Sequence, residues 1–385
     1  MVKVALFTSF GPDGGGGAVN LRSWLDHLPD LDVTWFHLGP PARLWPNCVS
    51  LGPPLVGGQL AGDLVRTPAM WLGLLGGAID RIAERVLAHR ADRHWVVAMD
   101  EGVPLGTRLL QRASAVPLHV SIQDDQEHGM YGRSRRYRML ARLTRAPVRR
   151  LLRAARSVDV TSTEMADYYR TQLGLRSTVL HPIVAGPAPT PGALAVTRDP
   201  RRLTMGHIGS VYSGGELETM IEGLKRAAAV AGREPAAVFI GLLPRYHALV
   251  ARAGIAVELP SHLEERDAVP ALARCDFVYA MYPFDRASDV FRRTSLPTKL
   301  TTYVQTGRPI LAHAPAESTL ARIVSRFAVG AACERNDPGA LAQGIASLLA
   351  QSIAPARFGT LRETFYAIDN AHKLSAMLRY GDVTP

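Results

Sequence analysis

Two carboxylates and a histidine follow a short apolar run at residues 118–122. The run leads directly into Asp124, Asp125 and His128. Acidic and imidazole groups at the end of a strand suit the binding of an acceptor hydroxyl or the transfer of a proton. We therefore take Asp124 and His128 as the candidate catalytic residues. The same spacing can hold a metal, but adjacent carboxylates without a second group of histidines are weak evidence for one. A solvated loop is the plain alternative.

A glycine-rich loop at residues 11–17 lies between a predicted strand and a predicted helix. Glycines let the backbone come close to a ligand, and the N-terminus of a helix favours negative charge. The loop is not a phosphate-binding loop of the G-x-x-x-x-G-K-[ST] type, because Ala18 and Val19 follow its last glycine. No acidic residue stands where a dinucleotide fingerprint needs one. The loop either faces a ligand or is a flexible turn.

A second loop of this kind, Gly-His-Ile-Gly-Ser-Val-Tyr-Ser-Gly-Gly, covers residues 206–215. It follows the first predicted strand of the second half and precedes a helix. Its backbone amides and the hydroxyls of Ser210 and Tyr212 suit contact with a phosphate at the start of that helix.

Three cations lie close together further along the chain. Arg292, Arg293 and Lys299 stand beside several hydroxyl side chains, where a helix is predicted to begin. Cations and a helix N-terminus together suit a pyrophosphate. A plain helix cap is the alternative.

The segment between residues 133 and 156 holds ten arginines and no acid. Leucines and a valine at helical spacing give it an apolar side. Such a basic amphipathic helix suits an anionic membrane surface, and a solvated helix face is the alternative. No aromatic residues alternate with the arginines as nucleic-acid binding would require, so we expect no nucleic-acid partner. The arginines are Arg133, Arg135, Arg136, Arg138, Arg142, Arg145, Arg149, Arg150, Arg153 and Arg156.

Short apolar runs alternate with helical patterns along the whole chain, which predicts parallel strands with helical crossovers and hence an α/β fold. A proline-rich break at residues 185–200 separates two such series. We expect an N-terminal domain at 1–185, a linker at 186–200 and a C-terminal domain at 201–357. A last helix within 358–385 is expected to return to the first domain. The predicted strands cover 2–10, 33–38, 95–99, 118–122, 158–162, 203–208, 237–240, 255–259, 277–281, 309–312 and 328–331.

Length and composition agree with this organisation. A chain of 385 residues predicts two domains, and 47% hydrophobic residues exclude global disorder. The formal charge of +10 fits an anionic partner. Three widely separated cysteines predict neither disulfides nor a zinc site. The N-terminus resembles a core strand rather than a signal peptide, and no apolar run is long enough to span a bilayer. We expect a cytoplasmic protein, peripheral on the membrane if it touches one.

The chain as a whole resembles the GT-B glycosyltransferases, in particular the retaining group of family 4. Residues 296–311, Leu-Pro-Thr-Lys-Leu-Thr-Thr-Tyr-Val-Gln-Thr-Gly-Arg-Pro-Ile-Leu, are similar to the donor-site helix P-S-K-L-x-E-Y-x-A-x-G-x-P-V of that family. The resemblance implies two Rossmann-like domains that face a cleft. It also implies transfer of a sugar from a nucleotide-diphosphate sugar to an acceptor hydroxyl, with retention and without a metal or other cofactor.

The resemblance assigns roles to individual residues. It places Lys299, Ser295 and Thr298 near the donor diphosphate, with Arg292 and Arg293 as further candidate cations. Gly209 and Ser210 contact phosphate through the backbone, Leu259 to His262 border the base, and Gly15 and Gly16 approach the donor. Asp124 and His128 lie near the acceptor or the transferred sugar.

Two positions depart from the family pattern. Thr294 and Thr302 stand where the family usually has glutamates, and the second glutamate normally binds the ribose. A hydroxyl makes a weaker hydrogen bond than a carboxylate, which puts donor identity and affinity in question. Two other functions therefore stay open: a nucleotide-sugar 2-epimerase on the same fold, and a non-catalytic protein that binds a sugar nucleotide or a polyanion. The expected acceptor is a saccharide, a lipid-linked saccharide or a small molecule.

Overall fold

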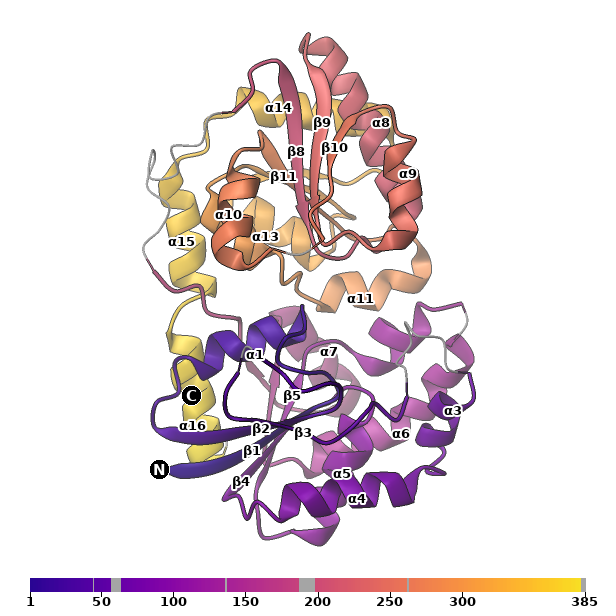
Figure 1. Ribbon diagram of the computed structural model, residues 1–385, viewed down its shortest axis with the longest axis vertical. Coiled ribbons are helices and arrows are strands. Elements are labelled where there is room, and N and C mark those ends of the chain that lie inside the picture. The colour runs from indigo at the N-terminus through magenta and orange to yellow at the C-terminus, as the bar shows by residue number, and fades with distance from the viewer. Residues whose placement is uncertain (44, 57–63, 136, 187–197, 262, 382–385) are drawn as a thin grey trace. The chain divides into compact units, whose positions relative to one another are not determined.

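The structure is a computed structural model that describes residues 1–385 except 44, 57–63, 136, 187–197, 262 and 382–385. The chain forms two compact units (Figure 1). Unit 1 comprises Met1–Ile183, Arg286–Leu296 and Ile368–Pro385, and unit 2 comprises Val184–Asp285 and Pro297–Ala367. Most of the predicted linker lies outside the described residues.

Unit 1 is built on a seven-stranded sheet in the order β3-β2-β1-β4-β5-β6-β7, in which all paired strands are parallel. Val4, Ala5, Leu6 and Phe7 of β1 are all fully buried, because helices cover both faces of the sheet. The strands are β1 (Val2–Thr8), β2 (Leu31–His37), β3 (Cys48–Ser50), β4 (Arg93–Val97), β5 (Leu118–Ile122), β6 (Ser157–Val160) and β7 (Thr178–Val179).

The helices of unit 1 come from three separate parts of the sequence. The first part contributes α1 (Gly17–Leu25), α3 (Arg66–Trp71), α4 (Gly76–Leu87), α5 (Gly102–Arg112), the π-helix η1 (Gln126–Gly132), α6 (Arg138–Ala154) and α7 (Thr163–Leu173). Two later parts contribute η3 (Arg286–Ser288), α11 (Asp289–Thr294) and α16 (Asp369–Tyr380).

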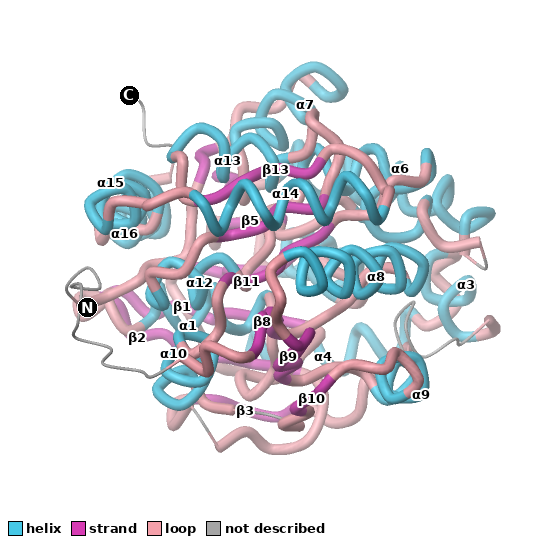
Figure 2. The backbone as a smooth tube through the Cα atoms, turned by 90° about the horizontal axis from the view of Figure 1, so that it is seen from above, coloured by secondary structure: helices cyan, strands magenta, loops and turns pink. Residues whose placement is uncertain are grey.

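Unit 2 contains a six-stranded parallel sheet in the order β10-β9-β8-β11-β12-β13. Its strands are β8 (Arg202–Ile208), β9 (Glu234–Ile240), β10 (Ala256–Glu258), β11 (Phe277–Met281), β12 (Ile310–His313) and β13 (Gly330–Cys333). Its helices are α8 (Gly214–Val230), η2 (Pro244–Tyr246), α9 (His247–Ala251), α10 (Glu265–Ala273), α12 (Leu300–Thr306), α13 (Thr319–Phe327), α14 (Pro338–Ala350) and α15 (Pro355–Phe365). Helices α8 and α14 lie side by side (Figure 2).

In both sheets the strand order reverses beside the first strand of the unit, between β1 and β4 in unit 1 and between β8 and β11 in unit 2. Ligands of open α/β sheets bind beyond the carboxyl ends of the strands at such a reversal. The topology therefore directs attention to the loops that follow these four strands.

The structure confirms the predicted α/β class, the two Rossmann-like units and a C-terminal helix that returns to the first of them. Helix α16 packs on unit 1, where Leu374 and Met377 join a core cluster with Trp24 of α1. The single final helix predicted at 358–379 is wrong. It is two helices, because the chain leaves helical geometry at Tyr366, whose carbonyl accepts a hydrogen bond from Val184 N–H at 3.1 Å.

The helix predicted over 296–305 is also shorter than expected. Helix α12 begins at Leu300, because residues 296–299 form a loop and a turn rather than helix. The separate helix α11 ends before them, at Thr294, and is part of unit 1. Ser295 between them has an extended backbone, which breaks the helical pattern. Throughout the described part of the chain, no helix has the length and apolar character needed to cross a membrane.

Candidate functional site

In unit 2, the loop after β8 makes a tight turn that begins at Gly209. This residue has φ +76°, a left-handed conformation that glycine adopts without strain. Its N–H donates to the carbonyl of Ile240 on the neighbouring strand at 2.8 Å. The turn leaves Ser210 exposed between the sheet and the start of α8. The backbone just after β8 is thus exposed to solvent at the point where the strand order reverses.

Lys299 reaches this loop from the N-terminal end of α12. Its Nζ donates to the carbonyl of Ser210 at 2.7 Å and lies 5.4 Å from the centre of the Tyr212 ring. Burial lowers the pKa of Lys299 to about 7. This lysine therefore titrates near neutral pH, and an anion bound beside it would favour the charged form.

The lysine also contacts a buried histidine. Nζ of Lys299 lies 3.4 Å from Nε2 of His207 on β8, and Nδ1 of His207 lies 3.0 Å from the carbonyl of Tyr279. A carbonyl only accepts, so we assign the proton to Nδ1, and Nε2 is then left to accept from the lysine. Burial, with a smaller contribution from the Lys299 charge, lowers the pKa of His207 to about 3. The imidazole is therefore neutral and fixes the direction of the ammonium.

A carboxylate already occupies the N-terminus of α8. Glu216 is buried in the first turn of the helix, accepts from Phe284 N–H at 3.0 Å, and is also hydrogen-bonded by the Ser213 hydroxyl. This contact ties the loop after β11 to the loop after β8. The N-terminus of α8 is therefore already occupied by a side chain of this helix.

The remaining residues predicted for unit 2 are more scattered. Thr298 accepts backbone and side-chain hydrogen bonds from Thr301 through its carbonyl, and Thr302 is buried. Leu259 follows β10, and its side chain is 39% exposed. His262 lies outside the described residues. Of these residues, only Thr298 and Thr302 lie with Lys299 at the start of α12.

Arg292, Arg293 and Ser295 belong to unit 1 rather than to the unit that holds Lys299. The guanidinium groups of Arg292 and Arg293 both pair with Asp289, at 2.9 Å and 3.1 Å. The three predicted cations therefore do not form one cluster in a single unit. Residues three and four apart on a helix are neighbours, so both guanidinium groups of the short α11 lie beside the same carboxylate.

In unit 1, the adjacent carboxylates after β5 have different roles. Asp125 is buried and caps the π-helix η1, accepting from His128 N–H at 2.6 Å and Gly129 N–H at 3.2 Å. It also accepts from the Tyr169 hydroxyl at 2.7 Å. All of its contacts hold structure. The π-helix that it caps begins two residues after Asp124, and π-helices are rare and often occur at functional sites.

Asp124 has few contacts within the unit. Its carboxylate accepts from the Ser295 hydroxyl. Burial raises the pKa of Asp124, and the Ser295 hydrogen bond and the nearby Arg133 charge act in the opposite direction. Arg133 itself lies over the Phe291 ring of α11, 3.9 Å from the ring centre. A carboxylate in this state can accept a hydrogen bond from a hydroxyl group or exchange a proton with it.

His128 is more open to solvent, with 41% of its side chain exposed. Its Nε2 lies 3.3 Å from a carboxylate oxygen of Glu127, which also pairs with Arg145. The Glu127 carboxylate therefore orients the His128 imidazole, in the way that a neighbouring group orients the general base of an enzyme.

The glycine loop after β1 also reaches this edge of the sheet. A Cβ atom at Gly17 would lie 1.8 Å from Oε1 of Gln123, whose Nε2 donates to the Gly17 carbonyl at 3.1 Å. Gly15 and Gly16 are exposed, and a Cβ at either would meet no heavy atom within 4 Å. Gly17 therefore serves packing, and its two predecessors leave the backbone accessible.

Asp100, after β4, was missed by the sequence analysis. It has φ +41°, which is uncommon for a residue with a side chain and often marks a functional site. Its carboxylate accepts from the Tyr131 hydroxyl at 2.7 Å, and Tyr131 accepts from Trp71 Nε1 at 3.1 Å. Burial raises the pKa of Asp100. The available signal was its place directly after the predicted strand 95–99.

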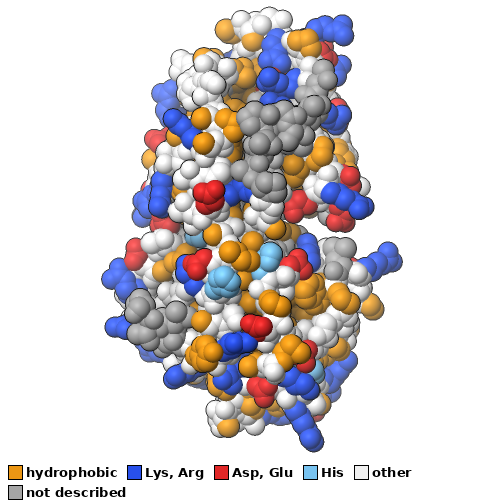
Figure 3. Space-filling model, turned by 90° about the vertical axis from the view of Figure 1, so that its left-hand side faces the viewer, with side chains coloured by type: hydrophobic (Ala, Val, Ile, Leu, Met, Phe, Trp, Pro, Cys, Tyr) orange, Lys and Arg blue, Asp and Glu red, His pale blue; other side chains and the backbone are white. Residues whose placement is uncertain are grey.

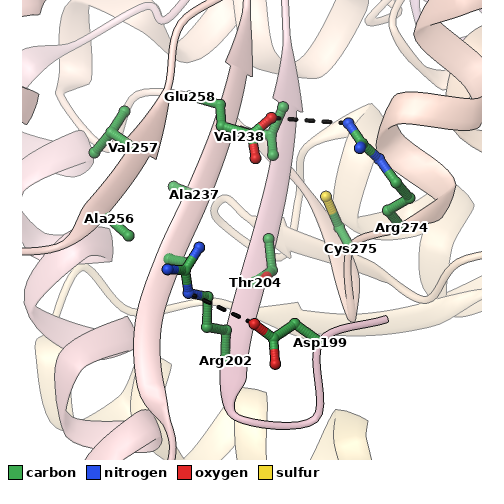
Figure 4. Close-up of a pocket in the computed structure, with 11 residues that line it drawn as sticks. Asp199, Arg202, Thr204, Ala237, Val238, Ala256, Val257, Glu258, Arg274 and Cys275 are labelled. Atoms are coloured by element: carbon green, nitrogen blue, oxygen red, sulfur yellow. Dashed lines mark ion pairs between the residues drawn. The ribbon is translucent and has the colours of Figure 1, made fainter. Parts of the chain in front are cut away.

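A hollow in unit 2 lies away from all these loops, near the amino-terminal ends of its strands (Figure 4). Residues of β9 and β10, including Ala237 and Val257, contribute to its lining. Its charges pair with one another, Arg202 with Asp199 and Arg274 with Glu258, each at 3.7 Å. The paired charges and the position at the wrong end of the sheet distinguish this hollow from the candidate site.

No family model matches this chain, and no curated protein matches it in sequence. Solved structures do match it over nearly its full length. One is an α,α-trehalose 6-phosphate synthase from Burkholderia multivorans, with a TM-score of 0.62, 13% identity and 98% of each chain covered. Another, from Listeria monocytogenes, is provisionally assigned as a UDP-N-acetylglucosamine 2-epimerase, with a TM-score of 0.61, 12% identity and coverage of 98% of this chain and 96% of that one.

A third match is LpCGTa in complex with UDP, with a TM-score of 0.55, 12% identity and coverage of 98% of this chain and 100% of the other. At these identities the likeness shows the fold alone. The chain has the GT-B fold, with two Rossmann-like units, and its structural neighbours include proteins that bind UDP.

Proposed function

We propose that this protein is a glycosyltransferase of the retaining family 4 type, which transfers a sugar from a nucleotide-diphosphate sugar to an acceptor hydroxyl. The observation that carries the proposal is Lys299. Its ammonium lies on the loop after β8, at the strand-order reversal of unit 2. Neighbours with the same fold bind UDP, and the diphosphate of such a donor is an anion that suits this position.

In the proposed reaction, the bond between the anomeric carbon and the diphosphate oxygen breaks, and the acceptor oxygen bonds to the anomeric carbon. The diphosphate leaves with the bonding electrons. Lys299 stabilises this developing charge, and the loop at Gly209 and Ser210 offers backbone contacts. The resemblance to family 4 implies retention and a metal-independent reaction.

Unit 1 supplies the acceptor side of the proposal. Asp124 binds an acceptor or sugar hydroxyl, and His128, oriented by Glu127, takes up or returns a proton. The exposed backbone at Gly15 and Gly16 lies at the same edge of the sheet. These groups suit a hydroxyl-bearing acceptor such as a saccharide, a lipid-linked saccharide or a small molecule.

The likeness to the protein from Listeria monocytogenes favours a second candidate function, a nucleotide-sugar 2-epimerase. Such an enzyme converts its donor without an acceptor. Donor consumption that depends on an acceptor therefore separates the two enzymes, and absence of any donor consumption leaves the binding protein.

The first experiment is a thermal-shift screen against UDP, GDP, dTDP, ADP and CMP without added metal. A ligand at about 100 times its Kd adds about 2.7 kcal/mol of stability, which gives a measurable shift in Tm. We expect one nucleoside diphosphate to shift the wild type and the Lys225→Ala control, in which a solvent-exposed lysine of α8 is removed. Lys299→Ala should bind it about 1.5–3 kcal/mol more weakly. A shift with none of the nucleotides, or an unchanged affinity in Lys299→Ala, contradicts the proposed site.

A further inference from the structure

Helix α6 carries a stripe of arginines on its solvent side. Arg138, Arg142, Arg149 and Arg153 recur at intervals of four and seven residues, which places them along one side of an α-helix. Arg138, Arg142 and Arg153 are exposed, and Arg149 is half-buried. The opposite side of the helix is anchored, because Leu151 and its neighbours Val148 and Leu152 are buried in the core of unit 1. The arginines are therefore presented on a fixed helix.

The stripe is not neutralised by acidic side chains. Helix α6 contains no Asp or Glu. Within the described residues, Arg142 and Arg153 of the stripe and Arg150 beside it form no ion pair with a carboxylate, whereas Arg145 of the same helix pairs with Glu127. On the face of the molecule seen in Figure 3, by contrast, acidic and basic side chains are mixed. Arg149, Arg150 and Arg153 surround a shallow hollow on the surface of α6 whose remaining lining is alanine.

Exposed apolar side chains occur on α6 and at both ends of α3, a helix that packs against it. Helix α3 packs against α6 (Figure 1). Leu72 and Leu74, directly after α3, are 58% and 73% exposed, and Leu64, before it, is 49% exposed. Met139, in the first turn of α6, is 89% exposed. Single exposed apolar residues are ordinary, but Met139 on α6 and three leucines flanking the packed helix α3 expose apolar area that a partner can remove from water.

We infer that the α3–α6 surface of unit 1 docks on a membrane that contains anionic lipids, with the α6 arginines on the lipid phosphates and Leu72, Leu74 and Met139 inserted between the headgroups. Charge complementarity selects the anionic lipid, and the adjacent apolar side chains select a surface that accepts them. The phosphates of a nucleic acid would also pair with the arginines, but a nucleic acid offers no apolar environment that would bury the exposed leucines. The inference does not rest on the proposed function, because it concerns a surface separate from the loops of the candidate site.

The test is binding of the full chain to vesicles of phosphatidylcholine with or without about 30% phosphatidylglycerol, measured by co-sedimentation over a range of salt concentrations. We expect binding only to the anionic vesicles. Reversal of three arginines in R142E/R150E/R153E should weaken it about 100-fold or more. The matched control is R252E/R266E/R326E, which makes the same change in net charge at exposed positions of unit 2 and should weaken binding far less.

Insertion of the apolar residues is tested separately. L72D/L74D should lose most of the binding that survives at high salt. A tryptophan introduced by L74W should be quenched by brominated lipids, because the side chain enters the bilayer. The melting temperature of each variant, with and without the nucleoside diphosphate, establishes that the fold and the nucleotide site are intact.

Three outcomes overturn the inference. One is equal binding to vesicles with and without phosphatidylglycerol, and another is an equal loss of binding in the two triple variants. The third is absence of vesicle binding together with tight binding to duplex DNA that R142E/R150E/R153E abolishes, which would identify a nucleic-acid surface instead. None of these results depends on sugar transfer, so they are distinguishable from a failure of the proposed function.

Discussion

The ammonium of Lys299 lies 3.4 Å from Nε2 of His207, a buried imidazole whose other nitrogen faces the carbonyl of Tyr279. Burial lowers the pKa of this lysine to about 7, so the proposed diphosphate site has a cation whose charge depends on pH near neutrality. The lysine comes from α12 and the histidine from β8, 92 residues apart in the sequence. Their meeting links the loop after the first strand of unit 2 to the motif that resembles a donor helix.

Donor binding should therefore weaken as the pH rises. The pKa of Lys299 is about 7 in the free protein, and a bound diphosphate stabilises only the protonated lysine, so binding takes up a proton above that pH. We expect the affinity for a nucleotide-diphosphate sugar to fall between about pH 7 and pH 9, by up to about tenfold per unit. Calorimetry in buffers of different ionisation enthalpy measures the proton uptake.

Lys299→Arg is the control for this prediction, because a guanidinium stays protonated throughout the range. Its affinity should be nearly independent of pH. The same pH dependence in the wild type and in Lys299→Arg would exclude the lysine as its source.

The adjacent carboxylates Asp124 and Asp125 should respond in opposite ways to replacement. Asp125→Ala removes the cap of η1 and the partner of Tyr169, and should lower the free energy of unfolding by about 2–4 kcal/mol. Asp124→Asn keeps an oxygen that can accept from Ser295, so stability should change by less than about 1 kcal/mol. Sugar transfer should nevertheless fall by about 100-fold or more.

Urea unfolding and initial rates under saturating donor measure the two effects. If Asp124→Asn kept full activity, Asp124 would be a structural residue like its neighbour.

The glycine loop offers a matched pair of substitutions. Gly17→Ala puts a methyl group where Gln123 lies, which forces that side chain to move and give up its hydrogen bond to the Gly17 carbonyl. We expect a loss of about 1–2 kcal/mol in the free energy of unfolding. Gly15→Ala meets open space and should leave stability nearly unchanged, while reducing the affinity for whichever substrate approaches the loop. Equal melting temperatures for the two variants would contradict this packing role.

Buried histidines should make the protein sensitive to mild acid. Burial lowers the pKa of His94 and His313 to about 4, and the pKa of His181 and His207 to about 3. An unfolded histidine titrates near 6.5, so below that pH the unfolded state binds more protons than the native state. The stability present above about pH 6.5 is therefore lost as the pH falls, by about 2 kcal/mol per histidine at pH 5.

Urea titrations between about pH 7.5 and pH 5 measure this loss. His94→Asn should reduce the slope of stability against pH by close to one proton, whatever its effect on stability at neutral pH. An unchanged slope would show that His94 is protonated in the native state.

Much of the fold could be read from local patterns. Val4 to Phe7 and Phe277 to Met281 are continuous apolar runs, and such runs between helical patterns indicate strands buried on both faces. The prediction failed where the signal was tertiary. The end of α15 near Tyr366 has no proline or glycine to mark it, and the chain leaves the helix at the point where its carbonyl pairs with Val184.

The candidate site divides in the same way. The types and order of its residues, with an acid pair after β5, glycines after β1 and a lysine before α12, were determined by the sequence, because strand ends in a parallel sheet follow from local hydrophobic patterning. Only the tertiary structure decided their distant partners: Asp125 received the Tyr169 hydroxyl, and Asp124 received the hydroxyl of Ser295 from the second half of the chain. It also brought Lys299 to His207, whereas the pairing of Arg292 and Arg293 with Asp289 is local to one helix. Burial and pKa depend on groups distant in sequence that packing brings together, and local spacing does not carry that information.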